Sequence, residues 1–165
     1  MSSTKKEIKI IAAYSENRII GKDGKIPWRI PEDIKRFKDL TIPHPVIMGR
    51  KTYESIPDKF KPLPQRQNIV LSKSSDFSPG KGVIVARSLN EAIEKAHNID
   101  NEVFVIGGQN IYEQALPLSS RMYLTEIKLN YQGDSFFPEF DKSSWEEIKR
   151  ECFETFCFVD YVRKH

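Results

Sequence analysis

Asp33 is the residue whose type and position most clearly suggest chemistry. The stretch PWRIPEDIKRF (27–37) predicts a helix that begins at Pro31, because proline suits the first helical position. At about 100° per residue, Asp33 falls on the apolar face of this helix. The apolar residues of that face are Ile34, Phe37 and Leu40. The opposite face, expected to meet water, carries Glu32, Lys35, Arg36, Lys38 and Asp39.

Two explanations account for an acid at this place. An acid in the first turn is favoured by the helix dipole, by about 0.3–1 kcal/mol. Glu32 already supplies that charge from the wet face, whereas a buried carboxylate without a partner costs several kcal/mol. Asp33 therefore predicts a cationic or hydrogen-bonding ligand that meets it on the apolar face.

A first anion site is predicted by MGRKT (48–52). Gly49 permits a tight turn, and the amides of the following helix point toward an anion. Arg50, Lys51 and Thr52 add charge and a hydroxyl. Basic residues in a first turn oppose the helix dipole, so a purely structural account of them is weak.

Two further strand ends carry similar features. In IGGQNIYEQAL (106–116) the paired Gly107 and Gly108 allow a pyrophosphate to approach the backbone. The motif is not GxGxxG and no acid follows at the usual distance, so a standard Rossmann domain is poorly supported. Ser72, Lys73 and Ser74, at the end of the run NIVLS (68–72), suit a phosphate monoester. Three anion sites on one sheet edge predict a dinucleotide with an extra phosphate, which is NADPH rather than NADH.

The elements that must position these residues alternate along the chain. Strands are expected over 8–14, 45–49, 68–72, 82–86, 102–108 and 121–129, and helices over 31–40, 50–56, 88–97 and 109–116. This alternation predicts an α/β fold with a mainly parallel central sheet and helices on both faces. The tail, 145–154 and 155–164, predicts a C-terminal antiparallel hairpin at the sheet edge. Long loops at 15–28 and 57–67 are expected to be lids or binding loops.

Composition bounds the class of protein. With 165 residues, 39% hydrophobic and 30% charged, the chain is expected to form one domain, 1–165. No signal peptide, membrane span or basic stripe is evident, so a cytoplasmic protein that binds neither membrane nor nucleic acid is expected. Cys152 and Cys157 lack zinc spacing and are expected to be free thiols, with no metal site.

The motifs together resemble one known family. They are IAA (11–13), IGKDGKIPW (20–28), PEDIKRFK (31–38), PVIMGRKTYESI (45–56), PLPQRQNIVLS (62–72), VIGGQNIYEQAL (105–116), YLTEI (123–127) and GDSFFP (133–138). In this order they resemble dihydrofolate reductase of the bacterial type over nearly the whole chain. The resemblance implies a monomeric enzyme of one-carbon metabolism that binds antifolate inhibitors. It would transfer a hydride from nicotinamide C4 of NADPH to C6 of 7,8-dihydrofolate, with protonation of N5, to give tetrahydrofolate.

The resemblance also implies roles on the substrate side. Asp33 matches the acid that hydrogen-bonds the pterin, and Trp28 and Thr125 match the pair that orders a water near the pterin and near Asp33. The walls of the substrate site correspond to Ile11, Ala12, Ile34, Phe37, Ile56, Leu63 and Ile106. Arg66 matches the arginine that pairs with the glutamate tail, a task that suits a bidentate guanidinium. Taken singly, each apolar residue is more simply explained by core packing.

On the cofactor side the resemblance implies a larger set. Tyr112 and Ile106 match groups beside the nicotinamide, and Ala13 and Ile20 match the backbone that holds its carboxamide. Arg50, Ser72 and Lys73 match the contacts of the 2′-phosphate, and Arg87 matches a basic position by the adenine. The residues expected near the pyrophosphate are Lys51, Thr52, Gly107, Gly108 and Gln109. The remaining contacts are Gly49, Leu71, Asn110 and Ile111. A cis peptide is expected between Gly107 and Gly108. Departures from the family pattern are Lys73 in place of a serine, Gln109 in place of a third glycine, and a longer loop containing DKFK.

Two other functions fit parts of the pattern. A pyrimidine reductase of riboflavin synthesis would share the fold and NADPH but lack an acid placed as Asp33 is. A non-catalytic nucleotide-binding module would keep the anion sites without needing that carboxylate. Asp33 therefore separates the three hypotheses.

Overall fold

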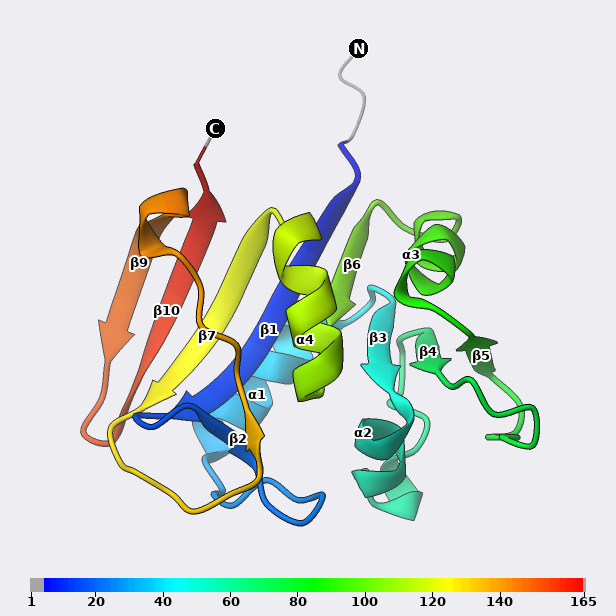
Figure 1. The fold of residues 1–165 in the computed structure, drawn as a ribbon, viewed down its shortest axis with the longest axis horizontal. Helices are drawn as coiled ribbons and strands as arrows, with labels where there is room; N and C mark the ends of the chain where they lie inside the picture. The colour runs from blue at the N-terminus through cyan, green and yellow to red at the C-terminus, as the bar shows by residue number, and fades with distance from the viewer. Residues whose placement is uncertain (1–4, 165) are drawn as a thin grey trace.

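The computed structural model describes residues 5–164 and is built around one eight-stranded sheet (Figure 1). Its strands are β1 (Glu7–Ser15), β3 (Val46–Gly49), β4 (Asn68–Leu71), β5 (Val83–Ala86), β6 (Glu102–Val105), β7 (Arg121–Ile127), β9 (Trp145–Cys152) and β10 (Phe156–Arg163). Their order across the sheet is β5-β4-β3-β6-β1-β7-β10-β9. Residues 1–4, where no signal peptide is expected, and residue 165 lie outside the described part.

The direction of the strands confirms the predicted topology. Every neighbouring pair from β5 to β7 is parallel, and β10 pairs antiparallel with both β7 and β9. The hairpin therefore extends one edge of the sheet, as expected. In such a sheet the crevice beyond the carboxyl ends of the parallel strands is the usual place for a ligand.

Helices cover both faces of the sheet, which was also predicted. They are α1 (Pro31–Thr41), α2 (Arg50–Ser55), α3 (Leu89–His97) and α4 (Gln109–Ala115), with short 3-10 turns at Asp58–Phe60, Leu116–Leu118 and Lys142–Ser144. Figure 1 shows α3 and α4 in front of the sheet and α1 behind it. Successive residues of β1 alternate between the two faces, with Ile10 in the core beneath α3 and α4 and Ile11 in the core beneath α1.

Some boundaries and a small element differ from expectation. The strand expected over 102–108 ends at Val105, because the backbone turns at the glycine pair that follows. Within the expected loop 15–28, β2 (Ile19–Gly21) pairs with β8 (Ser135–Phe136) in a second, two-stranded sheet. Both strands are too short to show a periodic pattern in the sequence. In the part of the chain that the structure describes, no helix has the length and apolar character needed to cross a membrane.

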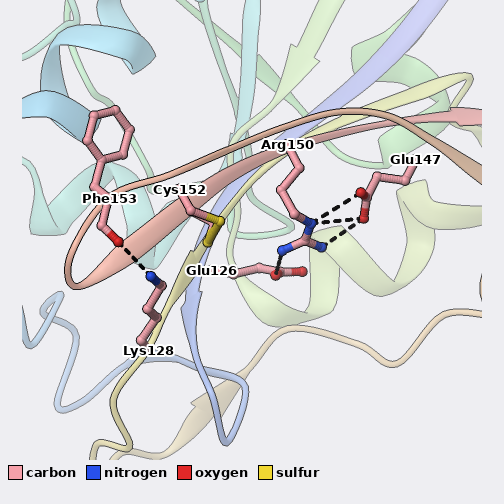
Figure 2. Close-up of a disulfide and its surroundings, with 7 residues drawn as sticks. Glu126, Lys128, Glu147, Arg150, Cys152 and Phe153 are labelled. Carbon is pink, nitrogen blue, oxygen red and sulfur yellow. Dashed lines mark hydrogen bonds and ion pairs between the residues drawn. A yellow bond between two sulfur atoms is a disulfide. The ribbon is translucent and has the colours of Figure 1, made fainter.

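The expectation of free thiols is wrong. Cys152 and Cys157 form a disulfide that joins β9 to β10 (Figure 2). The two residues are direct partners in the antiparallel register, which brings their side chains together. A hairpin whose strands meet between positions 154 and 155 already places 152 opposite 157, so this pairing was implied by the predicted hairpin.

Candidate active site

Asp33 lies in the first turn of α1 and contacts the neighbouring sheet. The hydroxyl of Thr125, a buried residue of β7, donates a hydrogen bond to Asp33 Oδ1 at 2.5 Å. Thr125 points toward α1 because side chains alternate along β7, with Leu124 and Met122 in the core on the opposite face. The contact therefore fixes one carboxylate oxygen of the acid against the carboxyl end of a central strand.

Burial governs the electrostatics of Asp33. Loss of solvent raises the pKa of its carboxyl above the ordinary value, while the Thr125 hydrogen bond and the charge of Arg36 act in the opposite direction. Tyr112 of α4 is buried within reach of the charge of Asp33. Burial first, and the charge of Asp33 second, raise the pKa of the Tyr112 phenol. Burial thus favours the protonated form of the acid, while groups from α1 and β7 favour the ionised form.

The apolar residues expected to surround the substrate lie mostly on the α1 side of the sheet. Ile11 is buried there, and Phe37, Ile56, Leu63 and Ile106 pack against the same cluster. Ile34, one residue after Asp33, is 51% exposed. Ala12 belongs to the other core, beneath α3 and α4. An exposed isoleucine beside a partly buried acid is a surface on which a flat apolar ring can rest.

Arg66 is brought to the far end of α1. Its guanidinium donates to the Thr41 hydroxyl at 3.0 Å and to the Pro64 carbonyl at 2.9 Å. The Arg66 Cζ atom lies 5.8 Å from the centre of the Phe37 ring. Burial lowers the pKa of Arg66, which means that its positive charge is poorly solvated. A carboxylate ligand would compensate for the lost solvation by pairing with this charge.

The glycine pair forms a bare turn between β6 and α4. The Gly107–Gly108 peptide is cis, as expected, and Gly107 has φ of 121°. The Gly49 amide donates to the Gly107 carbonyl at 2.9 Å, so the ends of β3 and β6 are joined at this turn. A Cβ on Gly107 would meet the Tyr112 ring at 3.3 Å, and one on Gly108 would meet the Thr52 hydroxyl at 3.4 Å. The space that a Cβ would take is filled by Tyr112 and Thr52, and φ of Gly107 is positive, so this turn favours glycine at both positions.

Tyr112 connects the glycine turn to strand β1. Its hydroxyl donates to the Ile11 carbonyl at 2.8 Å, inside the core. Ile111 is also buried, and its side chain fills the space beside Gly49. Asn110, exposed on α4, accepts a hydrogen bond from Gln114. These contacts hold the turn, and the assignment of Ile111 and Asn110 as cofactor contacts stays a prediction.

The basic residues expected along the cofactor lie in two places, at the ends of β4 and β5 and at the start of α2. Arg87 donates to the Lys73 carbonyl at 3.4 Å, so its guanidinium lies against the backbone of Lys73 at the ends of β4 and β5. Ser72 is buried, and its hydroxyl accepts a hydrogen bond from the Ser74 amide. Arg50 lies over the Phe77 ring at 4.7 Å and contacts Glu54.

A cavity of about 490 Å³ adjoins Arg50, and a second of about 120 Å³ adjoins Arg36. Asp33 lines neither of them. Lys73, Arg87 and Lys51 are all exposed cations, and Leu71 packs against the core beneath α3. The assignment of these residues as cofactor contacts stays a prediction.

The loop between β1 and α1 is held to the segment that carries β8. The Trp28 ring lies 5.2 Å from the Tyr131 ring, and the Asp23 amide donates to the Asp134 carboxylate at 3.1 Å. Ile20 of β2 packs against the core, and Ala13 of β1 pairs with Thr125 of β7. Loop 15–28 thus has fixed contacts next to the strand ends.

Two side chains have roles that the sequence did not predict. Gln109, expected near the pyrophosphate, accepts a hydrogen bond from the Phe136 amide of β8 at 2.8 Å. Arg36 was placed on the wet face of α1, and this is wrong: its side chain is 15% exposed and ion-paired with Asp160 of β10. At about 100° per residue Arg36 falls only about 40° from Leu40, at the edge of the apolar stripe, so a partner on the sheet can draw it in.

A parallel sheet with a bare glycine turn and cations at its strand ends, and an acid on an apolar helix nearby, defines the class of nicotinamide-nucleotide-dependent reductases. Comparison with known families narrows the class. The family model described as dihydrofolate reductase matches residues 7–163, and the chain belongs to the dihydrofolate reductase family.

Individual relatives agree with this family. The chain is 46% identical over 144 residues to the dihydrofolate reductase of Neisseria gonorrhoeae, covering 87% of this chain and 86% of the relative. It is 41% identical over 161 residues to dihydrofolate reductase HdrB of Haloferax volcanii, covering 94% and 82%. A solved dihydrofolate reductase from Enterococcus faecalis, complexed with NADP(H) and RAB-propyl, superposes with a TM-score of 0.88 at 32% identity and covers 98% of each chain. The chain is an NADPH-dependent oxidoreductase that reduces dihydrofolate, and the two rival functions are set aside.

Proposed function

We propose that this protein reduces 7,8-dihydrofolate to tetrahydrofolate with Asp33 as its single active-site acid. One observation carries the assignment of the acid: a partly buried carboxylate on the apolar side of α1, bonded to Thr125 of a central strand. Burial of a carboxylate without a cationic partner in contact is unfavourable unless a ligand uses it. The amino group and ring nitrogen of a pterin are donors that such a carboxylate can accept from.

The substrate would be held at both ends. Ile34 and Phe37, on the same helix as Asp33, supply an apolar wall for the pterin and the aminobenzoyl ring. Arg66, anchored to Thr41 at the end of α1, supplies a guanidinium for the glutamate α-carboxylate. A planar guanidinium fits a carboxylate with two parallel hydrogen bonds. Helix α1 would therefore set the distance between the reacting ring and the tail.

The cofactor would lie along the ends of β1, β3, β4 and β6. When bound, NADPH supplies the hydride that goes from nicotinamide C4 to C6 of the substrate. Gly107 and Gly108 carry no side chain, which would let the pyrophosphate approach the backbone. Lys73 and Arg87 would supply positive charge for the extra phosphate, since both are exposed and the Arg87 guanidinium lies against the Lys73 backbone. Tyr112 holds this turn to β1 through its bond to Ile11.

The proton for N5 depends on Asp33. A carboxyl whose pKa is raised by burial retains its proton closer to neutral pH than an exposed one does. Loop 15–28, tied to the β8 segment, would keep bulk water from the reacting atoms. The protein thus contributes alignment of two rings and control of one proton.

The test follows the loss of NADPH absorbance with dihydrofolate for the wild type, Asp33→Asn and Asp39→Asn. Asp39 is a matched control, because it is an exposed carboxylate on the same helix, paired with Lys35. We expect Asp33→Asn to lower kcat/KM by at least about 100-fold at neutral pH, the scale of general acid–base catalysis, and Asp39→Asn to leave it unchanged. Equal rates for Asp33→Asn and the wild type would contradict the mechanism.

We also propose that the chain works as a single-domain monomer in the cytoplasm and is inhibited by antifolates that compete at Asp33. The eight strands share one sheet, and all the proposed site residues lie on this one chain. Light scattering coupled to size-exclusion chromatography tests the monomer, and a mass twice that of the chain would contradict it.

A further inference from the structure

Arg36 and Asp160 form a part of this site that the sequence did not reveal. Both side chains are 15% exposed, and the guanidinium and carboxylate are in direct contact. Arg36 Nη1 also donates to the Leu124 carbonyl at 3.2 Å. Its guanidinium lies over the Phe158 ring, 4.4 Å from the centroid. One side chain thus joins α1 to β7 and β10.

The place of these contacts matters for Asp33. Arg36 follows Asp33 by three residues, and side chains at this spacing are neighbours on a helix. Leu124, whose carbonyl it binds, precedes Thr125, whose hydroxyl binds Asp33. The acid and the arginine are therefore hydrogen-bonded to consecutive residues of the same strand. Movement of the arginine would shift the carboxylate relative to Thr125.

We propose that Arg36, held by Asp160, is a positioning residue that keeps Asp33 against Thr125 and favours the negative charge on its carboxylate. This inference rests on the proposed role of Asp33. Arg36 is not proposed to touch the substrate. Its two effects are geometric, through Leu124, and electrostatic, through its charge.

The charges that surround the pair set the size of the electrostatic effect. Tyr123 of β7, Phe158 and Asp160 of β10, and Lys149 and Glu151 of β9 line a cavity of about 120 Å³ with Arg36. Asp160 offsets much of the arginine's charge at a distance. Asp33 accepts a hydrogen bond from Thr125, its charge raises the pKa of Tyr112, and the charge of Arg36 lowers the pKa of Asp33 against the dominant effect of burial.

The measurement is the pH profile of kcat/KM. The relevant limb is defined as the one that is absent in Asp33→Asn, and its midpoint is compared among variants. Arg36→Gln removes the positive charge, and we expect the midpoint to rise by about half to one pH unit, below most of the range for a close opposite charge because Asp160 compensates. Arg36→Lys retains the charge and should restore the midpoint, although one ammonium cannot replace all the contacts of the guanidinium.

Two further variants separate charge from packing. Asp160→Asn leaves the charge of Arg36 uncompensated, so the midpoint should fall. Lys149→Gln is the matched control, because Lys149 is an exposed cation directly opposite Asp160 in the β9–β10 register and should not shift the midpoint. Thermal unfolding of every variant reports its structural effect separately.

The outcomes are decisive in each case. A midpoint in Arg36→Gln equal to that in Lys149→Gln, even with reduced thermal stability, would overturn the proposal and leave Arg36 as a structural anchor. If Arg36→Gln does not fold, a lower midpoint in Asp160→Asn together with a wild-type midpoint in Arg36→Lys would support the proposal, and an unchanged or higher midpoint in Asp160→Asn would overturn it. Absence of an Asp33-dependent limb in the wild type would instead reject the proposed role of Asp33, before the arginine variants are compared.

Discussion

Replacing Thr125 with valine tests the link between Asp33 and the sheet. Valine has nearly the same shape, so the change removes the hydroxyl that donates to Asp33 Oδ1 at 2.5 Å and leaves the packing of β7 in place. A hydrogen bond to a charged group contributes about 1.5–3 kcal/mol, and one to a neutral group about 0.5–1.5 kcal/mol. Loss of the bond therefore harms the ionised carboxylate more than the protonated one.

The effect of Thr125→Val on the pKa of Asp33 has a definite sign. At 1.36 kcal/mol per pKa unit, the larger loss for the ionised form raises the pKa of Asp33 further, by about one unit. Burial already raises the pKa of Asp33 in the folded protein, so the folded state binds this proton more tightly than the unfolded chain does. Its contribution to stability is full below the unfolded pKa and is lost as pH rises through the folded pKa. Thr125→Val should extend that decline to higher pH and so increase the total loss.

The assay is urea unfolding of wild type and Thr125→Val on both sides of the Asp33 midpoint. We expect the variant to lose about 1 kcal/mol more free energy of unfolding on the alkaline side than on the acid side. The same comparison in an Asp33→Asn background is the control, where the pH dependence of the loss should vanish. An equal loss at both pH values would refute the reasoning, because the hydroxyl would then make no distinction between the two states of the acid.

Three further changes test other parts of the site. Gly107→Ala places a Cβ 3.3 Å from the Tyr112 ring at φ of 121°, so we expect a loss of about 1–3 kcal/mol in unfolding free energy and weaker NADPH binding by fluorescence titration; retention of both would show that the turn tolerates a side chain. Arg66→Lys should raise KM for dihydrofolate about tenfold with kcat unchanged, whereas KM for dihydropteroate, which lacks the glutamate tail, should not change; equal effects on both substrates would remove Arg66 from the tail site. Cys152→Ser opens a loop of sequence separation 5, which should lower the free energy of unfolding by about 2 kcal/mol without reductant and by nothing with it.

The fold was predictable because its elements are locally consistent. The buried β-branched runs and the helices between them required a parallel sheet, and the alternating tail required the edge hairpin. The capping contact of α3, from the Glu91 amide to the Ser88 hydroxyl at 3.1 Å, was likewise present in the residue spacing. The β2–β8 sheet was not predictable, because two short strands far apart in the chain leave no periodic signal.

The site was predictable where local pattern implies chemistry. Asp33 violates the polarity of its helix, and the glycine pair interrupts a strand–helix junction, so both are visible without coordinates. Arg36 was misplaced because helical periodicity cannot tell which neighbour faces the edge of an apolar stripe. Its partner Asp160 is 124 residues away, and such pairings follow from tertiary structure alone.

The bond between Gln109 and strand β8 limits what that amide can offer a ligand. A backbone N–H requires an acceptor, so the Phe136 contact fixes the orientation of the Gln109 amide, with its oxygen toward the strand. The NH₂ group of the Gln109 amide is consequently the group that can hydrogen-bond a ligand, and it acts as a donor. At a position where glycine would contribute no side chain, this molecule therefore presents a neutral group whose polarity suits an oxyanion and disfavours a cation.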